Sequence, residues 1–324
     1  MLKIIKYLFF ILISSILMYI AFRDQDLSDI ASKLSSINYK WIIVSMICGV
    51  LAIISRGLRW VFLIESLGYN ISKKNSIHTV AIGYFTNILI PRAGEITRCT
   101  SLQQVEGVPF NKLFGTLILE RLIDLAILIL LVLVAFLYKF SEISTFFTEV
   151  LGSSSNDIFY SPIVIMLLII ILLTTTIWLL RDQLNKLSYY KKIKHILIGL
   201  KDGLTSLKGI SKKIPFILHT IFIWLMYIIM TYVCFFAIKE TASLSFLDGV
   251  YMTIIGGLGM IVPSQAGIGS YHLAVKIGLT GIGIAVQPAL LFAFSVHTAQ
   301  TVMTIIFGII SSISLISIKK NEHV

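Results

Sequence analysis

The stretch Asn87–Arg98, NILIPRAGEITR, decides how this chain folds, because it places a proline, a glycine, a glutamate and two arginines inside an apolar run. Proline removes a helical hydrogen-bond donor and glycine permits a chain reversal, so a helix is expected to break here. A related stretch, VPSQAGIGS, runs from Val262 to Ser270. The two stretches predict two broken helical segments with hinges at Pro91, Gly94, Pro263, Gly267 and Gly269.

The composition indicates a membrane protein. Of the 324 residues 57% are hydrophobic and 13% are charged, and the mean hydropathy is +0.92. One soluble core cannot hide so much apolar surface, so we expect a single all-α integral membrane domain over residues 1–324. The net charge of +11 is carried largely by short loops, which is how a membrane protein fixes its orientation, so no nucleic-acid partner is expected. The cysteines have no metal-ligand spacing, and we expect neither cofactor nor metal.

Apolar runs of sufficient length predict six full spans. They cover about Ile4–Phe22, Trp41–Leu58, Leu113–Leu137, Pro162–Leu180, Ile214–Ile238 and Ala285–Ile318. The second span is expected to end with Arg56 and Arg59 and to be followed by Lys73 and Lys74, and these cations place its far end in the cytoplasm. The connector over about 181–213 is the most basic and is expected to be cytoplasmic as well. Both termini are then cytoplasmic in an inner (plasma) membrane.

The two broken segments are not expected to cross. A full crossing by about 78–98 would translocate the basic connector, and a full crossing by about 248–283 would move the C-terminus outside. Two re-entrant helical hairpins that enter from opposite faces preserve the charge pattern, and they suggest an inverted repeat. The alternative is two kinked helices that share a breaking dipeptide by chance.

Polar and charged side chains gather at the first break and on the following helix. They are Asn87, Arg92, Glu95, Arg98, Glu120, Arg121 and Asp124. Each charge at the centre of a lone helix costs roughly 2.5–3.5 kcal/mol, so each should face the interior and find a partner. One interpretation is a purely structural ion network of Glu95 or Glu120 with the arginines. The other is that arginines remain available to a phosphate head group, which the guanidinium fork matches.

The second break is polar but less charged. Its candidate binding residues are Ser264, Gln265, Ser270, Tyr271 and His272. A half-helix that begins after Gly267 or Gly269 would point free N–H groups and partial positive charge at an anion. A hydrogen-bonded interior histidine is the more ordinary interpretation of His272, as it is of His297.

At these residues the sequence resembles the lysylphosphatidylglycerol synthase transmembrane-region family, a flippase-like membrane domain. The resemblance rests on NILIPRAGEITR, LILERLIDL (Leu117–Leu125) and VPSQAGIGSYHLAV (Val262–Val275), in this order. It implies a polytopic inner-membrane protein linked to movement of amphiphilic lipids between leaflets. Bifunctional relatives add a soluble aminoacyl-transferase domain, which is not seen before Val324, so synthesis of a lysyl-lipid is not expected.

Three functions are compatible with these observations. The leading one is a flippase-like transporter for a phospholipid or a polyprenyl phosphate, which is not an enzyme. An intramembrane transferase with Glu95, Glu120 or Asp124 as base is the second, although metal-pair, P-loop and hydrolase motifs are missing from the sequence. A scaffold or accessory subunit of lipid-linked biosynthesis is the third. A homodimer is left open.

Overall fold

The computed structural model describes residues 2–23, 25–138, 210, 212–262 and 264–321, and the regular structure in these ranges is helical throughout. The chain forms two compact units, Met1–Arg121 with Gly209–Val324, and Leu122–Lys208. The first unit holds both broken segments. The expected span Pro162–Leu180 lies outside the described residues, as does almost all of the basic connector 181–213.

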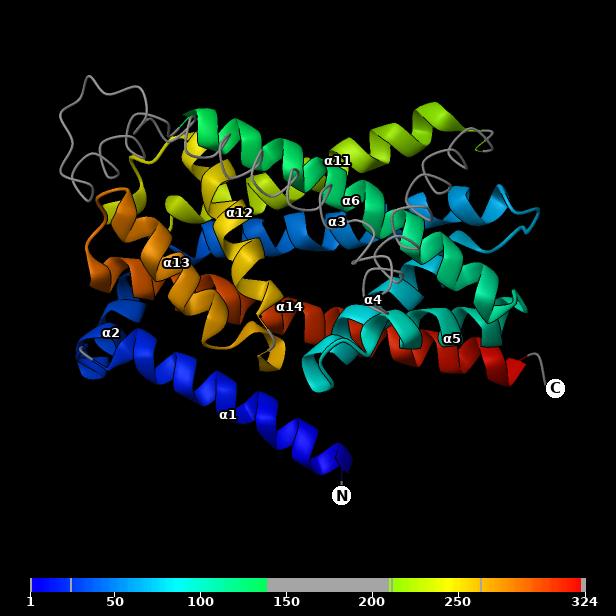
Figure 1. Cartoon of the computed structure of the whole chain (residues 1–324), viewed down its shortest axis with the longest axis horizontal. Coiled ribbons are helices and arrows are strands. Elements are labelled where there is room, and N and C mark those ends of the chain that lie inside the picture. The colour runs from blue at the N-terminus through cyan, green and yellow to red at the C-terminus, as the bar shows by residue number, and fades with distance from the viewer. Residues whose placement is uncertain (1, 24, 139–209, 211, 263, 322–324) are drawn as a thin grey trace, which may run out of the picture. The chain divides into compact units, whose positions relative to one another are not determined.

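The helices follow one another in a recurring order (Figure 1). A long helix is followed by two short helices around a break and then by another long helix, once in each half of the chain. The α-helices are α1 (Leu2–Phe22), α2 (Leu27–Lys33), α3 (Tyr39–Glu65), α4 (Lys73–Leu89), α5 (Gly94–Glu106), α6 (Phe110–Tyr138), α11 (Lys213–Phe235), α12 (Phe246–Ile261), α13 (Ser270–Gly281) and α14 (Val286–Asn321). Short 3-10 turns lie at Leu34–Ser36 (η1), Lys239–Thr241 (η4) and Gln265–Gly267 (η5).

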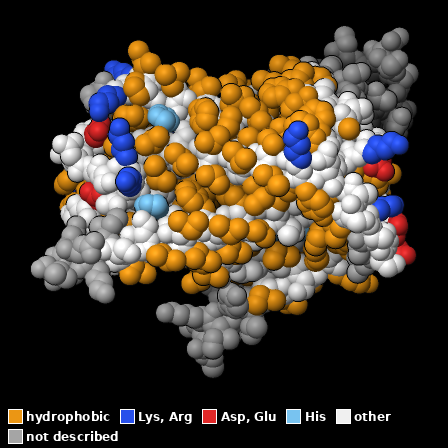
Figure 2. Space-filling model, turned by 180° about the vertical axis from the view of Figure 1, so that it is seen from behind, with side chains coloured by type: hydrophobic (Ala, Val, Ile, Leu, Met, Phe, Trp, Pro, Cys, Tyr) orange, Lys and Arg blue, Asp and Glu red, His pale blue; other side chains and the backbone are white. Residues whose placement is uncertain are grey.

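The expectation of an all-helical membrane protein is confirmed. Within the described ranges, three helices are long and apolar enough to cross a membrane: Tyr39–Glu65, Lys213–Phe235 and Val286–Ser317. Many large apolar side chains are exposed on them, such as Ile43, Ile217 and Ile313. On the face in Figure 2, hydrophobic side chains cover the broad middle, while most Lys, Arg, Asp and Glu side chains gather toward two opposite ends. This distribution suits a hydrocarbon layer between two aqueous phases.

Helices α3 and α11 pack side by side in opposite directions. At one end of the pair, Lys212 Nζ lies 3.0 Å from Glu65 Oε2. At the other end, the Asn38 N–H donates to Ala237 O at 3.0 Å. The start of each helix therefore lies beside the end of its partner.

The two helical hairpins begin at opposite ends of this pair. Near the end of α3, the hydroxyl of Ser76 on α4 donates to Gly57 O at 2.7 Å. Near the end of α11, Gly249 on α12 is packed so closely on Tyr232 that a Cβ would lie 3.0 Å from the tyrosine Cβ. The hairpin α4–α5 and the hairpin α12–α13 thus approach each other from opposite directions, with their breaks between them (Figure 1).

Two sets of contacts hold the hairpins in place. His78 on α4 lies between two serines of α14, with its ring nitrogens 3.0 Å from Ser311 Oγ and 3.1 Å from Ser314 Oγ. On the other side, the buried side chains of α11 to α14 form one hydrophobic cluster, which includes Phe235, Met252, Leu279, Leu290 and Phe292. Burial of this apolar surface fixes the second hairpin against the long helices.

Candidate functional site

The first break reverses the chain at Arg92. Helix α4 ends at Leu89, α5 begins at Gly94, and Arg92 has a φ of 64°. A left-handed backbone is uncommon for a residue other than glycine and costs energy unless the surroundings enforce it. At this break the positive φ falls on Arg92 and not on Gly94, which begins α5. Gly94 instead permits close packing, because a Cβ there would meet Gly83 O and the side chain of Asn87.

Asn87 joins the two helices of this hairpin. Its Oδ1 accepts a hydrogen bond of 2.7 Å from the backbone N–H of Gly94, the first residue of α5. The first N–H groups of a helix have no partner within the helix, so this bond caps α5 from across the break. Asn87 therefore has a structural role in addition to its place beside the cavity described next.

The second break is longer and is closed by hydroxyl groups. Ala266, Gly267 and Gly269 have φ values of 53°, 78° and 81°, and α13 begins at Ser270. The Oγ atoms of Ser264 and Ser270 lie 2.6 Å apart across the loop, and both side chains are buried. The predicted hinge Pro263 lies outside the described residues.

The two breaks contact each other. The side-chain amide of Gln265 donates to Ile88 O at 2.6 Å and to Leu89 O at 3.0 Å. In return, Arg92 Nη2 donates to Ile261 O, at 3.4 Å. The carbonyls at the end of a helix lack partners within that helix. The second break therefore supplies donors to the end of α4, and the first break supplies a donor to the end of α12.

A space with both polar and apolar lining residues, here called the tip cavity, lies between the breaks. Its volume is about 180 Å³, and both hairpins line it, with Asn87, Pro91, Arg92, Glu95, Met260, Ile261, Val262, Ser264, Ala266 and Gly267. Asn87 and Glu95 also line a second space of about 20 Å³ beside Arg98 and Arg121. Glu95 Oε1 lies 3.2 Å from Arg121 Nη2, and both side chains are partly exposed, at 31% and 44%.

A buried ion cluster lies behind this cavity. The carboxylate of Glu120, which is 0% exposed, accepts two hydrogen bonds from Arg98, at 3.0 and 2.9 Å. Arg56 donates to it from Nη2 at 2.7 Å, and Arg59 Nη2 lies 3.5 Å away. The guanidinium of Arg98 also stacks 3.8 Å from the ring centre of Trp60. A buried charge of this kind is stable only with such pairing.

A family model for the lysylphosphatidylglycerol synthase transmembrane region matches residues 7–308 of this chain. The chain belongs to this family. A UPF0104 membrane protein from Methanocaldococcus jannaschii is 32% identical over 121 residues, which cover 36% of this chain and 34% of that relative. The match thus spans about a third of the relative's length. No solved structure matches the chain significantly. The resemblance seen in the sequence is confirmed.

Not all of the residues that carry the family resemblance line the tip cavity. Tyr271 and His272 are not among its lining residues. His272 is buried, its Nδ1 accepts a hydrogen bond of 3.3 Å from the Gly269 N–H, and its ring lies 4.9 Å from that of His297. This agrees with the interpretation of a hydrogen-bonded interior histidine. Asp124 lies further along α6, in the second compact unit.

The structure corrects the prediction that the second span ends near Leu58 with Arg56 and Arg59 as orienting cations at its cytoplasmic end. Helix α3 continues to Glu65, and both arginines lie within it, buried at 3% and 0% exposure. A signal was present, because cations three residues apart share one face of a helix and Glu120 needed a partner. In this member of the lysylphosphatidylglycerol synthase transmembrane-region family, the ion cluster thus joins α3, α5 and α6.

Proposed function

We propose that this protein moves a phosphate-headed lipid, a phospholipid or a polyprenyl phosphate, between the leaflets of the inner (plasma) membrane. The observation that carries the proposal is the tip cavity, a space between the ends of two opposed hairpins that Arg92, Glu95, Asn87 and Ser264 line together with apolar residues. Irregular backbone is tolerated at membrane depth only where it is buried in protein or lines a wet cavity. Paired broken helices at corresponding places in two halves are also typical of transporter binding sites.

The proposal includes a topology. The chain would cross six times, with the hairpins α4–α5 and α12–α13 as re-entrant segments that enter from opposite faces, and with both termini in the cytoplasm. The antiparallel arrangement of α3 and α11 supports an inverted repeat, since the element order around each is the same. Rocking of one half against the other would then expose the tip cavity to each leaflet in turn.

Among the candidate arginines, Arg92 is assigned the head-group contact. Arg98 makes a two-pronged pair with Glu120, and Arg121 pairs with Glu95. Arg92 is exposed and lines the tip cavity, and the one side-chain hydrogen bond that it makes to Ile261 O is long, at 3.4 Å. A guanidinium fork in this position matches two phosphate oxygens.

A reconstituted flip assay tests the proposal. Purified protein is placed in liposomes that contain a fluorescent phospholipid or polyprenyl phosphate, and an impermeant quencher reports the fraction of probe in the outer leaflet. We expect protein-dependent flipping of at least one probe, without chemical change to it. Turnover of the probe into a new lipid would support the enzyme alternative instead. No flipping across the panel would remove the proposal.

Arg92→Ala and Lys239→Ala form a matched pair for this assay. Both substitutions remove one exposed cation, but Lys239 lies in η4 and does not line the tip cavity. A hydrogen bond to a charged group contributes about 1.5–3 kcal/mol, so Arg92→Ala should slow flipping about tenfold to a hundredfold. Lys239→Ala should leave the flipping rate unchanged. Equal rates for the two variants would remove Arg92 from the mechanism.

A further inference from the structure

A second and larger space lies beside α1. It has a volume of about 870 Å³, within the range of about 300–1,000 Å³ that small-molecule sites occupy. One wall is α1, and the others come from the segment around α2, from η5 and its neighbour Ile268, and from α14. The residues that line this α1 groove are Ile11, Ser14, Ser15, Met18, Tyr19, Phe22, Arg23, Gln25, Ile30, Leu34, Gln265, Ile268 and Phe294.

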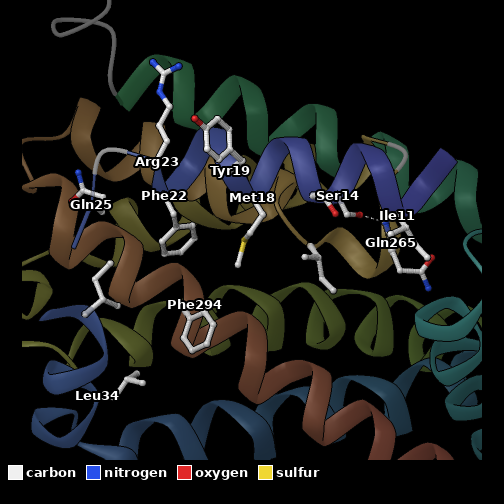
Figure 3. Close-up of a pocket in the computed structure, with 13 residues that line it drawn as sticks. Ile11, Ser14, Met18, Tyr19, Phe22, Arg23, Gln25, Leu34, Gln265 and Phe294 are labelled. Carbon is white, nitrogen blue, oxygen red and sulfur yellow. Dashed lines mark hydrogen bonds between the residues drawn. The ribbon is translucent and has the colours of Figure 1, made fainter. Parts of the chain in front are cut away.

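Within the part of the chain that the structure describes, α1 is fastened to the second hairpin, and the α1 groove lies beside this attachment. A Cβ at Gly269 would lie 2.6 Å from Ser14 O and 2.7 Å from Met18 N, so the two backbones almost touch there. The Ser14 hydroxyl accepts from the Gln265 N–H at 2.6 Å, and Lys276 donates to Ala21 O at 2.9 Å. On its other side α1 faces Phe294 of α14 across the groove (Figure 3).

The chemistry of the groove changes along its length. Arg23 and Gln25 lie at one end, and Gln265 and Ser14 lie at the other (Figure 3). Between them Met18, Phe22 and Phe294 present apolar surface. The Arg23 side chain extends away from Phe294, so its guanidinium lies outside the apolar space at this end (Figure 3). A cation in this place complements a lipid whose anionic phosphate lies outside the groove and whose hydrocarbon chain lies inside it.

The far end of the groove meets the tip cavity. Gln265 lines the α1 groove, whereas its neighbours Ser264 and Ala266 line the tip cavity. The second break therefore has a largely apolar space on one side and, on the other, a space that charged and polar side chains line together with apolar ones. A chain held in the groove would end beside the place where a head group is expected to cross.

We propose that the α1 groove holds one hydrocarbon chain of a phosphate-headed membrane lipid, with the phosphate at Arg23 and the chain directed toward Gln265. This inference rests on the proposed function, since it assigns the groove to the transported lipid in the leaflet on the Arg23 side. The methionine and the aromatic rings that line the groove suit chains of differing shape.

Photo-crosslinking tests the proposal. Full-length protein in nanodiscs is irradiated with phosphatidylglycerol that carries a diazirine on one acyl chain, and the labelled residues are mapped by mass spectrometry. A diacylglycerol with the same diazirine chain serves as the probe without phosphate. We expect saturable labelling at Met18 and Phe294 by the phospholipid, with about a tenfold weaker response to the diacylglycerol.

Ser15→Trp and Leu12→Trp separate the groove from general lipid contact. Ser15 lines the groove, whereas Leu12 is 58% exposed on α1 and does not line it. Ser15→Trp should abolish the saturable labelling, Leu12→Trp should leave it intact, and Arg23→Gln should reduce phospholipid labelling to the diacylglycerol level. All three variants must elute from size-exclusion chromatography like the parent protein. Labelling that does not saturate, or that Ser15→Trp leaves unchanged, would overturn the proposal.

The crosslinking and flipping experiments can fail independently of each other. Saturable labelling without lipid flipping would support the groove and remove transport. Flipping without saturable labelling would support transport and remove the groove.

Discussion

Gln265 and Leu89, from different halves of the chain, are joined by a hydrogen bond of 3.0 Å between the side-chain amide and the backbone carbonyl. The same amide reaches Ile88 O at 2.6 Å. The amide oxygen of Gln265 is buried and accepts no hydrogen bond from the described residues. The Gln265 side chain thus joins the two breaks, together with the Arg92 hydrogen bond to Ile261 O, and one of its acceptors stays buried without a partner among the described residues. Any motion that separates the hairpins must break both of its bonds.

Gln265→Ala should weaken this closure. The substitution removes the two hydrogen bonds to the Ile88 and Leu89 carbonyls, each of which contributes about 0.5–1.5 kcal/mol. We expect a lower Tm in detergent and a changed flipping rate, because the closed arrangement loses stability relative to the open one. Gln104→Ala, on an exposed position of α5, makes the same change away from the contact and should alter neither quantity. Unchanged values for Gln265→Ala would show that the contact does not hold the tips together.

Glu120→Gln should lower the stability of the protein rather than its transport activity alone. It leaves three buried arginines without their shared carboxylate, and disruption of a buried pair typically costs about 3–5 kcal/mol. We expect a large fall in Tm and in abundance in the membrane. Glu240→Gln, at an exposed position of η4, is the control and should be neutral. Normal abundance with lost flipping in Glu120→Gln would instead place the glutamate in the transport step.

The sequence anticipates the breaks better than it anticipates their contacts. Pro91 interrupts a helix for local reasons, and a charge such as Glu120 in an apolar helix demands a partner whatever the fold. The sequence places the partners Arg56 and Arg59 at the end of a span, because the apolar run stops at Leu58, whereas α3 continues for seven more residues to Glu65. The bond from Gln265 to α4 and the α1 groove arise only from tertiary packing, which local patterns do not report.

Ala266→Val should be strongly destabilising, although it adds only two methyl groups. The φ of Ala266 is 53°, a left-handed conformation that β-branched residues almost never adopt. A residue held in such a region costs on the order of 1–3 kcal/mol. Ala266→Gly is the contrasting variant, since glycine adopts this backbone without strain and should leave Tm unchanged or raise it. A fall in Tm of the same size for both variants would show that side-chain packing, and not backbone conformation, constrains this position.

Gly269→Ala, compared with Gly283→Ala, tests whether the close contact between Gly269 and α1 holds α1 against the second hairpin. Both glycines have a positive φ, at 81° and 89°, so alanine brings backbone strain on the order of 1–3 kcal/mol at either position. A Cβ at Gly283 meets nothing within 4 Å, whereas one at Gly269 would collide with the backbone of α1. Both variants should lower Tm.

Gly269→Ala alone should also release α1 from the second hairpin. We expect it to abolish saturable crosslinking of the diazirine phospholipid in the α1 groove, while Gly283→Ala retains this labelling at the parent level. Both variants strain the backbone, so a difference in labelling between them reports the contact of Gly269 with α1. If both variants lose the labelling, or both keep it, then the close approach of Gly269 to Ser14 does not form the groove.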